Sequence, residues 1–212
     1  MARYTDSVCK LCRREGEKLY LKGARCFSPK CAFEKRGFAP GQHGKSHQGR
    51  AERESDYARQ LRAKQRARRV YGIMERQFRR YFGVALKQRG VTGTNLLQTL
   101  ELRLDNVVFR MGLAENRSQA RQLVNHGHFK VNGRRADIPS MILQPGDVIN
   151  VSDTAKNLTF FKELPDIAEK RPCAVWMDRD LKGLSGRVLR LPERAEIDGS
   201  LNEQLIVEYY SR

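Results

Sequence analysis

The sequence predicts an α+β fold with a cysteine-rich N-terminal segment. Apolar residues recur at helical spacing in residues 55–90 and again in residues 99–126. Alternating apolar residues around an Asn-Gly pair follow in residues 128–137, a pattern that is typical of a β-hairpin. Four of the five cysteines stand within the first 31 residues, in a short basic segment that lacks the residues for a core of its own.

The excess positive charge lies in one part of the chain. The 212 residues include 41 Lys and Arg against 24 Asp and Glu, a formal net charge of +17. Residues 1–90 carry 24 basic and 8 acidic residues, whereas residues 91–212 carry 17 and 16. Concentrated positive charge repels itself unless an anionic partner neutralises it. The charge therefore predicts a nucleic-acid partner, ahead of a membrane surface or a merely solvated face.

Neither a membrane span nor a signal peptide is evident in the sequence. No apolar run approaches the roughly 18 residues that a transmembrane helix needs. The first residues lack the apolar stretch of a secretory signal. We therefore expect a cytoplasmic protein, whose thiols stay reduced.

The spacing of the N-terminal cysteines is that of a metal site. Two residues separate Cys9 from Cys12, and four separate Cys26 from Cys31. Two such short gaps let two turns present four sulfurs to one tetrahedral ion. The sequence therefore predicts a structural zinc ion (Zn²⁺) that staples the N-terminal segment, with four ligands: Cys9, Cys12, Cys26 and Cys31.

Three other interpretations of these thiols stay open. A pair of disulfides is one, although it fits poorly in a cytosolic chain. Four unrelated thiols are another. A third has His43 or His47 in place of one sulfur. A catalytic zinc is not expected, because it would keep an open position that four thiolates do not leave.

Residues 36–50 are rich in Gly, Pro, His and Gln and are predicted to form a loop. Residues 44–46, Gly-Lys-Ser, resemble the end of a phosphate-binding P-loop. Ala39, however, stands where the first glycine of that motif must be, and no strand precedes it. These two departures exclude a nucleoside triphosphatase of the P-loop type. A plain linker is the alternative to a basic loop that approaches a sugar-phosphate backbone. The candidate RNA-binding residues of this loop are Gln42, His43, Lys45 and Arg50.

Residues 55–71 predict an amphipathic helix that begins at the N-cap Ser55 and ends before Gly72. One face carries the apolar residues Tyr57, Leu61, Ala67 and Tyr71. The opposite face is a stripe of four arginines, whose guanidinium groups suit phosphate oxygens: Arg59, Arg62, Arg66 and Arg69. A second helix is expected from about residue 73 to residue 89, with Met74, Phe78, Tyr81, Phe82 and Leu86 available for packing.

Residues 99–151 predict a small module of two helices and a hairpin. The first helix covers residues 100–111, and the second begins at Asn116, with Gln119 placed as in a capping box. The Asn132-Gly133 pair predicts a tight turn between two strands, and another strand follows at residues 148–151.

No acidic residue stands between Glu115 and Asp137, so this module has a local positive surface. Such a surface recognises RNA by shape and phosphate spacing more than by sequence. A solvated charged face is the alternative. The candidate RNA-binding residues here are Arg117, Arg121, His126, His128, Lys130, Arg134 and Arg135.

These motifs carry a resemblance to a known family. The stretch "RLDNVVFRMGLAENRSQARQLVNHGHFKVNGRR" resembles the RNA-binding domain named after small-subunit ribosomal protein four. The stretches "PGQHG", "SDYARQLRAKQRARRVYGIMERQF", "GVTGTNLLQTLELRLDNVV" and "NEQLIVEYYSR" are similar to bacterial-type members of that ribosomal protein family, over essentially the whole chain. All four N-terminal cysteines are present, which implies the zinc-binding form.

The resemblance implies an architecture in which an RNA-binding module is inserted into a helical domain. On this basis residues 1–46 form the zinc-binding segment. Residues 47–98 together with about 177–212 form the helical rRNA-binding domain. Residues 99–176 form the inserted helix-helix-β-hairpin module.

The resemblance also implies a role in the small ribosomal subunit. Family members bind small-subunit rRNA at a multi-helix junction and nucleate assembly of the subunit body. They contact ribosomal proteins five and three, influence translational accuracy and line the channel through which mRNA enters. A cytoplasmic protein that is neither membrane-bound nor an obligate homo-oligomer is implied.

Two other classes of function compete with this one. An RNA-modifying enzyme would need a catalytic domain, but only about 60 residues follow residue 151, too few for a typical domain, and no catalytic motif is evident. A zinc-containing DNA-binding regulator would have similar charge. Basic character that extends over three segments favours a large folded RNA over one groove of a duplex.

Overall fold

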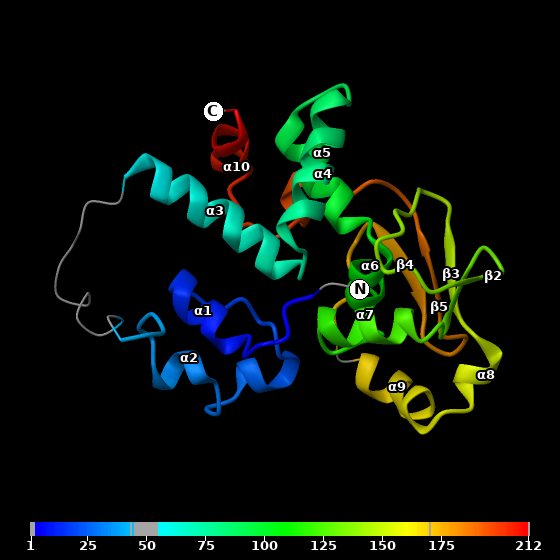
Figure 1. Ribbon diagram of the computed structural model, residues 1–212. Helices are drawn as coiled ribbons and strands as arrows, with labels where there is room; N and C mark the ends of the chain where they lie inside the picture. Colours follow the sequence, from blue (N-terminus) through cyan, green and yellow to red (C-terminus); the bar gives the residue numbers. More distant parts are fainter. Residues whose placement is uncertain (1–2, 43, 45–54, 170, 212) are drawn as a thin grey trace. The chain divides into compact units, whose positions relative to one another are not determined.

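The computed structural model describes residues 3–42, 44, 55–169 and 171–211 (Figure 1). The chain divides into two compact units. The first comprises Met1–Leu96 together with Gly199–Arg212, and the second comprises Leu97–Asp198. No helix in these ranges has the length and apolar character that crossing a membrane requires.

The first unit is helical. Its N-terminal part contains short elements, namely α1 (Cys9–Glu15), the 3₁₀ turn η1 (Gly23–Phe27) and α2 (Ala32–Lys35). Longer helices follow, namely α3 (Asp56–Val70), α4 (Glu75–Lys87) and α10 (Glu203–Tyr210). Helix α5 (Thr92–Glu101) begins in this unit and ends in the second.

Helix α3 begins as its sequence predicts. The Ser55 hydroxyl accepts a hydrogen bond from the Ala58 amide (3.2 Å), which satisfies one of the amides that a helix start leaves without a partner. Gly72 follows the helix with φ of +63°, a left-handed conformation that glycine adopts without steric cost. The limits expected for this helix are therefore confirmed to within one residue.

The apolar face of α3 is only partly as expected. Ala67 and Tyr71 are buried, but Tyr57 is 49% exposed. Gln60 and Lys64 are buried in its place. In α4, Phe78, Tyr81 and Phe82 are buried as predicted, whereas Met74 and Leu86 are exposed, which corrects the expectation that they pack inward.

Lys64 is buried because it has anionic and aromatic partners. Its ammonium donates to the Glu75 carboxylate (2.9 Å) and lies 4.7 Å from the ring centroid of Tyr209. A buried ammonium without such partners would be strongly destabilising. Because periodicity cannot show this pairing, the sequence does not predict a lysine on the buried face of α3.

Glu75 also holds the C-terminal helix. The Tyr210 hydroxyl donates to its carboxylate (2.8 Å), and the Tyr210 ring stacks on Phe82 with centroids 4.6 Å apart. Burial would raise the pKa of Glu75, but hydrogen bonds from Lys64 and Tyr210 outweigh it and lower this pKa. Helix α10 packs against α3, so that the C-terminal helix is part of the first unit (Figure 1).

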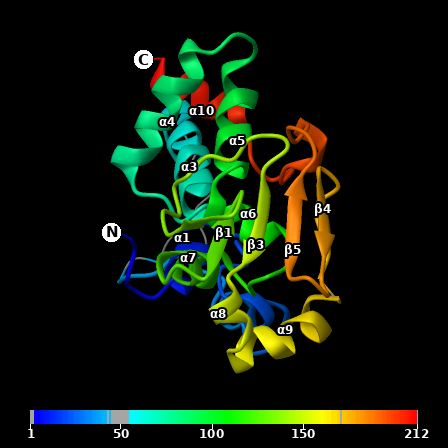
Figure 2. The same ribbon diagram turned by 90° about the vertical axis from the view of Figure 1, so that its right-hand side faces the viewer.

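The second unit combines helices with one antiparallel sheet. Its helices are α6 (Leu104–Arg110), α7 (Arg117–Asn125), α8 (Asp153–Lys156) and α9 (Thr159–Glu169). Its strands are β1 (Phe129–Val131), β2 (Arg134–Ala136), β3 (Val148–Val151), β4 (Met177–Asp180) and β5 (Ser185–Val188). The strand order is β2-β1-β3-β5-β4, and Figure 2 shows β3, β5 and β4 side by side.

The last two strands extend this sheet beyond its expected limit. The resemblance assigns residues 177–198 to the helical domain, whereas β5 pairs with β3 and the second unit continues to Asp198. Strand β4 has the sequence Met-Asp-Arg-Asp, in which only Met177 is buried. A strand with so few apolar residues gives little periodic signal.

The helix expected over residues 100–111 is interrupted. Helix α5 ends at Glu101, and α6 starts at Leu104. Between them, the Leu102 carbonyl accepts from the Leu143 amide (2.9 Å), and Arg103 forms an isolated bridge with Ile142. These bonds to a distant segment extend the backbone and break the helix.

The Asn-Gly hairpin is confirmed. Asn132 and Gly133 both have positive φ, +48° and +79°, as the tight primed turn requires. The Asn132 side chain accepts from the Val148 amide (2.9 Å) and donates to Asp147 (2.8 Å), which ties the turn to β3. The sheet packs on a core whose largest fully buried apolar side chains include Trp176, Phe129 and Phe161.

Replacing Tyr210 with Phe tests the docking of α10. The change keeps the stacked ring and removes the hydrogen bond to a charged partner, so we expect a loss of about 1.5 kcal/mol in unfolding free energy. Urea denaturation followed by circular dichroism at 222 nm measures it, with amide hydrogen exchange of residues 203–210 as a local readout. Tyr209→Phe is the matched control and should leave stability nearly unchanged. Equal stability of both variants would contradict the role of this bond.

Candidate nucleic-acid interface

The N-terminal cysteines lie together in the first unit. Helix α1 carries Cys9 and Cys12, η1 carries Cys26, and Cys31 directly precedes α2. The last three are buried, and Cys9 is partly buried. The Cys26 sulfur accepts a hydrogen bond from the Lys22 amide (3.4 Å). Sulfur atoms thus form the centre of this small fold.

The electrostatics of Cys12 show how near the other thiols are. Burial raises the pKa of this thiol, a backbone hydrogen bond from Leu19 opposes the shift, and the charges of the other three cysteines raise it further. In the absence of a cation the Cys12 thiol is therefore protonated at neutral pH.

The predicted zinc site is not confirmed by this arrangement. Among the described residues, no group of three or more His, Cys, Asp or Glu side chains is placed so that it could hold a metal ion. All five cysteines are free thiols, so the alternative of paired disulfides is not realised. Three of the four predicted ligands, Cys12, Cys26 and Cys31, are buried side chains in the N-terminal part of the first unit.

The arginine stripe of α3 faces carboxylates of its own chain. Glu15, whose side chain has no exposed area, pairs with Arg69 and with Arg62 (3.3 Å). Arg66 pairs with Glu17 (2.5 Å), and its guanidinium also donates to the Ser200 carbonyl (3.1 Å). Three of the four predicted phosphate-binding arginines therefore have internal anionic partners.

The fourth arginine of the stripe, Arg59, pairs with Asp56 at the surface of the same helix. Such an exposed pair contributes little to stability, and a phosphate competes with it readily. In the loop that follows the cysteines, Gln42 is exposed. The other candidates of that loop, His43, Lys45 and Arg50, lie outside the described residues.

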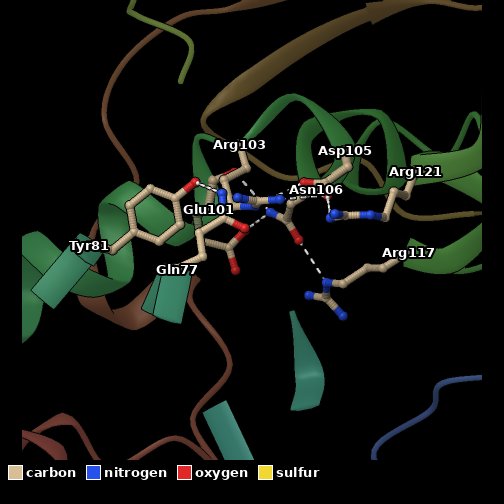
Figure 3. Close-up of polar contacts among 8 residues, drawn as sticks. All are labelled: Gln77, Tyr81, Glu101, Arg103, Asp105, Asn106, Arg117 and Arg121. Carbon is tan, nitrogen blue, oxygen red and sulfur yellow. Dashed lines mark hydrogen bonds and ion pairs between the residues drawn. The ribbon is translucent and has the colours of Figure 1, made fainter. Parts of the chain in front are cut away.

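A buried ion network underlies the second unit (Figure 3). The fully buried Arg103 donates two hydrogen bonds to Asp105, at 3.1 and 2.8 Å. Arg121 donates to the same carboxylate (3.0 Å) and is only 7% exposed. The sequence predicts that Arg121 binds RNA. In the structure its guanidinium is buried and binds Asp105 inside the unit, so it is not exposed to a ligand.

A second part of this network leads toward the surface. The Glu101 carboxylate accepts two bonds from Arg110, at 2.9 and 2.6 Å, and one from the Asn106 amide (2.7 Å). Asn106 in turn accepts a bond from Arg117 (2.7 Å), as Figure 3 shows. The Arg117 guanidinium also lies 4.5 Å from the Phe109 ring centroid. Arg117 is thus held in one orientation.

Sequence reasoning missed the carboxylate and amide residues of this network, namely Glu101, Asp105 and Asn106. Each lies within a helical pattern, where a polar residue is normally assigned to the solvent face. The only signal is the alternation of charge in the stretch Glu-Leu-Arg-Leu-Asp-Asn, residues 101–106, beside otherwise apolar positions.

Helix α7 has a defined start and end, and its end leads into the hairpin. Asn116 caps the helix as predicted, by accepting from the Gln119 amide (2.9 Å), while the Gln119 side chain accepts from the Glu115 amide (2.7 Å). Gly127 ends the helix with φ of +73°, and an added β-carbon there would lie 2.5 Å from the Arg135 guanidinium. The absence of a side chain at Gly127 is what lets Arg135 pack across this turn.

The hairpin carries exposed cations of the second unit. Arg134 and Arg135 are exposed and line a cavity of about 540 Å³, together with Asp137 and apolar side chains that include Ile138 and Met141. Lys130 pairs with the exposed Asp153 (2.7 Å). The arrangement offers positive charge beside an apolar wall, which suits a sugar-phosphate backbone.

The two histidines of this region lie near each other, with ring centroids 5.8 Å apart. Burial lowers the pKa of His128, and the positive charge of His126 and Arg135 lowers it further. At neutral pH His128 is therefore an uncharged donor or acceptor rather than a cation.

Comparison with known proteins identifies relatives along the whole chain. The model of the ribosomal protein S4/S9 N-terminal domain matches residues 3–101, and the S4 domain model matches residues 102–149. The chain is 57% identical to small ribosomal subunit protein uS4 of Pelotomaculum thermopropionicum. It is 54% identical to the proteins of the same name from Thermodesulfovibrio yellowstonii and Thermus thermophilus. Each alignment covers 100% of both chains.

The titration of His128 tests the electrostatics of the hairpin. We expect its ring to titrate below the ordinary histidine pKa of 6.5, because burial and two neighbouring cations disfavour the imidazolium. A proton NMR titration of the ring signals measures this, and His128→Gln assigns the resonance. Arg135→Gln removes one cation and should move the pKa of His128 upward. A value above 6.5 in the unaltered protein, or no change in the variant, would contradict the arrangement.

Proposed function

The chain belongs to the small ribosomal subunit protein uS4 family, and from this premise we propose that it is a structural constituent of the small ribosomal subunit that binds rRNA. The observation that carries this conclusion is 53–57% identity over the full length to proteins of that name. The family is one of structural ribosomal proteins, so the alternatives of an RNA-modifying enzyme and a DNA-binding regulator are set aside.

The distribution of charge supports rRNA as the ligand. The exposed Arg134 and Arg135 lie on the hairpin beside an apolar wall. Helix α7 and the buried network beneath it hold Arg117 in a fixed orientation. Cations fixed in this way bind phosphates without losing much side-chain entropy, which favours a folded RNA of defined shape.

The finer role follows from the family resemblance. We propose that the protein acts in the bacterial cytoplasm, binds a multi-helix junction of small-subunit rRNA and nucleates assembly of the subunit body. Contacts with small-subunit proteins five and three, and with mRNA where it enters the subunit, are part of the same proposal. Through these contacts the protein contributes to translational accuracy.

The four N-terminal thiols support a further part of the proposal, a structural Zn²⁺ held by Cys9, Cys12, Cys26 and Cys31. Soft thiolate sulfurs are the ligands that zinc prefers. Cys12, Cys26 and Cys31 are buried in one small core. The charges of Cys9, Cys26 and Cys31 raise the pKa of Cys12, so the four thiols are near one another. A bound divalent cation would favour deprotonation of these thiols and cross-link α1 to η1.

Metal analysis tests this part of the proposal. We expect about one zinc per chain by mass spectrometry of protein purified under reducing conditions. Cys12→Ser should lose the zinc and speed amide hydrogen exchange in residues 9–31, while exchange in the second unit stays unchanged. Cys173→Ser, which removes the fifth thiol, is the matched control and should keep the zinc. Protein that holds no zinc, even after incubation with zinc, would contradict the site.

Salt dependence of rRNA binding tests the main proposal. We expect the logarithm of the binding constant to fall steeply with the logarithm of salt concentration, because each phosphate contact releases counterions. Arg134→Gln with Arg135→Gln should reduce the slope by about 1.4–1.8, since each phosphate that a cation neutralises contributes about 0.7–0.9. Arg190→Gln is the control, because the half-buried Arg190 donates two hydrogen bonds to Glu196, at 2.8 and 2.5 Å, and the change should leave the slope unchanged. A flat slope in the unaltered protein would overturn the proposal.

A further inference from the structure

The N-terminal part of the first unit contains a basic pocket outside the predicted RNA-binding residues. The cavity has a volume of about 340 Å³. None of its lining residues is acidic, and the six cations among them are Lys10, Arg13, Arg25, Lys30, Lys35 and Arg36. So many like charges around one cavity repel each other unless an anion enters it.

The cations of this pocket differ from the arginine stripe of α3. Arg62, Arg66 and Arg69 pair with carboxylates of the chain. In the pocket, Arg13 is oriented by the Phe38 carbonyl, which accepts from its Nε (2.9 Å). The other five cations of the pocket make no ion pair with a carboxylate of any described residue. The pocket, which Cys9 also lines, therefore offers positive charge that no carboxylate of the described residues neutralises.

Two exposed aromatic rings lie on the same small fold. Tyr20 and Phe27 stack with ring centroids 4.9 Å apart and an interplanar angle of 26°. Tyr20 is 47% exposed and Phe27 is 76% exposed. The Tyr20 backbone has φ of +50°, a left-handed conformation that a tyrosine rarely adopts. Strain of this kind persists where the surrounding structure imposes it, and it gathers at functional sites.

One short segment links the pocket to the rings. Arg25 and Lys30 line the pocket, and Phe27 lies between them in the chain. The segment is fixed by hydrogen bonds from the Ser28 amide to the Arg25 carbonyl (3.3 Å) and from the Cys31 amide to the Ser28 carbonyl (3.0 Å). Charges for a phosphate and a flat ring for a base are thus presented by one turn.

We propose that this basic–aromatic surface (the six cations of the pocket with Tyr20 and Phe27) binds an unpaired segment of RNA. A backbone phosphate enters the pocket, and a base stacks on the aromatic pair. Unpaired RNA is the occupant that uses both features, since bases have flat faces that stack on aromatic rings and a backbone that needs cations. The inference rests on the proposed function, because it names a further contact with the same rRNA.

The surface differs from one that would dock a protein. Glu34, a carboxylate on α2, already pairs with Lys18. An acidic peptide could enter the pocket, but only one that also carries an aromatic or arginine side chain could stack on Phe27, whereas every nucleotide joins a phosphate to a flat base. The cations and the stacked rings together therefore favour unpaired RNA over a peptide.

Substitutions of Phe27 test the aromatic part in the full-length protein. Phe27→Ala should weaken binding to a single-stranded RNA oligonucleotide about 10-fold, as expected when one base stack is removed. Phe27→Leu, which keeps apolar area but not the flat ring, should weaken it similarly, whereas Phe27→Tyr should bind as the unaltered protein does. Because this side chain is exposed, the fold should persist, and circular dichroism checks it.

A fluorescent reporter and a charge variant complete the test. In Phe27→Trp, the oligonucleotide should quench the new indole, while the native Trp176, which is 1% exposed, stays unquenched. Lys10→Gln with Lys30→Gln should lower the salt slope of oligonucleotide binding.

The outcomes separate this inference from the proposed function. Full binding by Phe27→Leu, an unquenched indole, or displacement of the oligonucleotide by an acidic peptide but not by a second RNA would each overturn the inference. Small-subunit rRNA is titrated in parallel with the unaltered protein. If that rRNA fails to bind at all, the proposed function fails instead.

Discussion

The need to neutralise positive charge constrains the whole molecule. Residues 1–90 carry sixteen more basic than acidic side chains, and each cation needs water, a carboxylate or an external anion. The first unit places its few carboxylates where they serve several cations at once. Glu15 lies between two arginines of α3, and Glu75 lies beside Lys64, Arg68 and the Tyr210 hydroxyl. Several contacts that hold α3 to its neighbours in this unit therefore also neutralise its charge.

The second unit shows the same division between structural and available cations. Arg103 and Arg121 are buried against Asp105, and removing one partner of such a buried pair typically costs about 3–5 kcal/mol because a charge is left without compensation. Arg134 and Arg135 are exposed on the hairpin. A buried arginine thus supports the surface on which an exposed one is available to the proposed RNA ligand. Substitution of the two kinds should affect different quantities, stability in one case and affinity in the other.

Local features were predictable from the sequence, and long-range ones were not. The caps at Ser55 and Asn116 and the turn at Asn132 depend on residues close in the chain, and all three occur as predicted. The break between α5 and α6 depends on bonds to residues 141–143, and β4 and β5 have too few apolar residues to show a period. For the candidate site, periodicity places the arginines of α3 on one face, but it cannot show that Glu15 and Glu17 lie opposite them.

The partners of a charged residue therefore say more about its role than its position on a helical face. The stripe on α3 resembles an RNA-binding surface because it is regular, yet its regularity matches carboxylates of the N-terminal segment. The cations of the N-terminal pocket follow no period, since they come from α1, η1, α2 and the residues beside them, and they lack acidic neighbours in the cavity. In a strongly basic chain, the groups left without internal partners are the ones that can gain most from a phosphate, because binding there does not first have to break an ion pair.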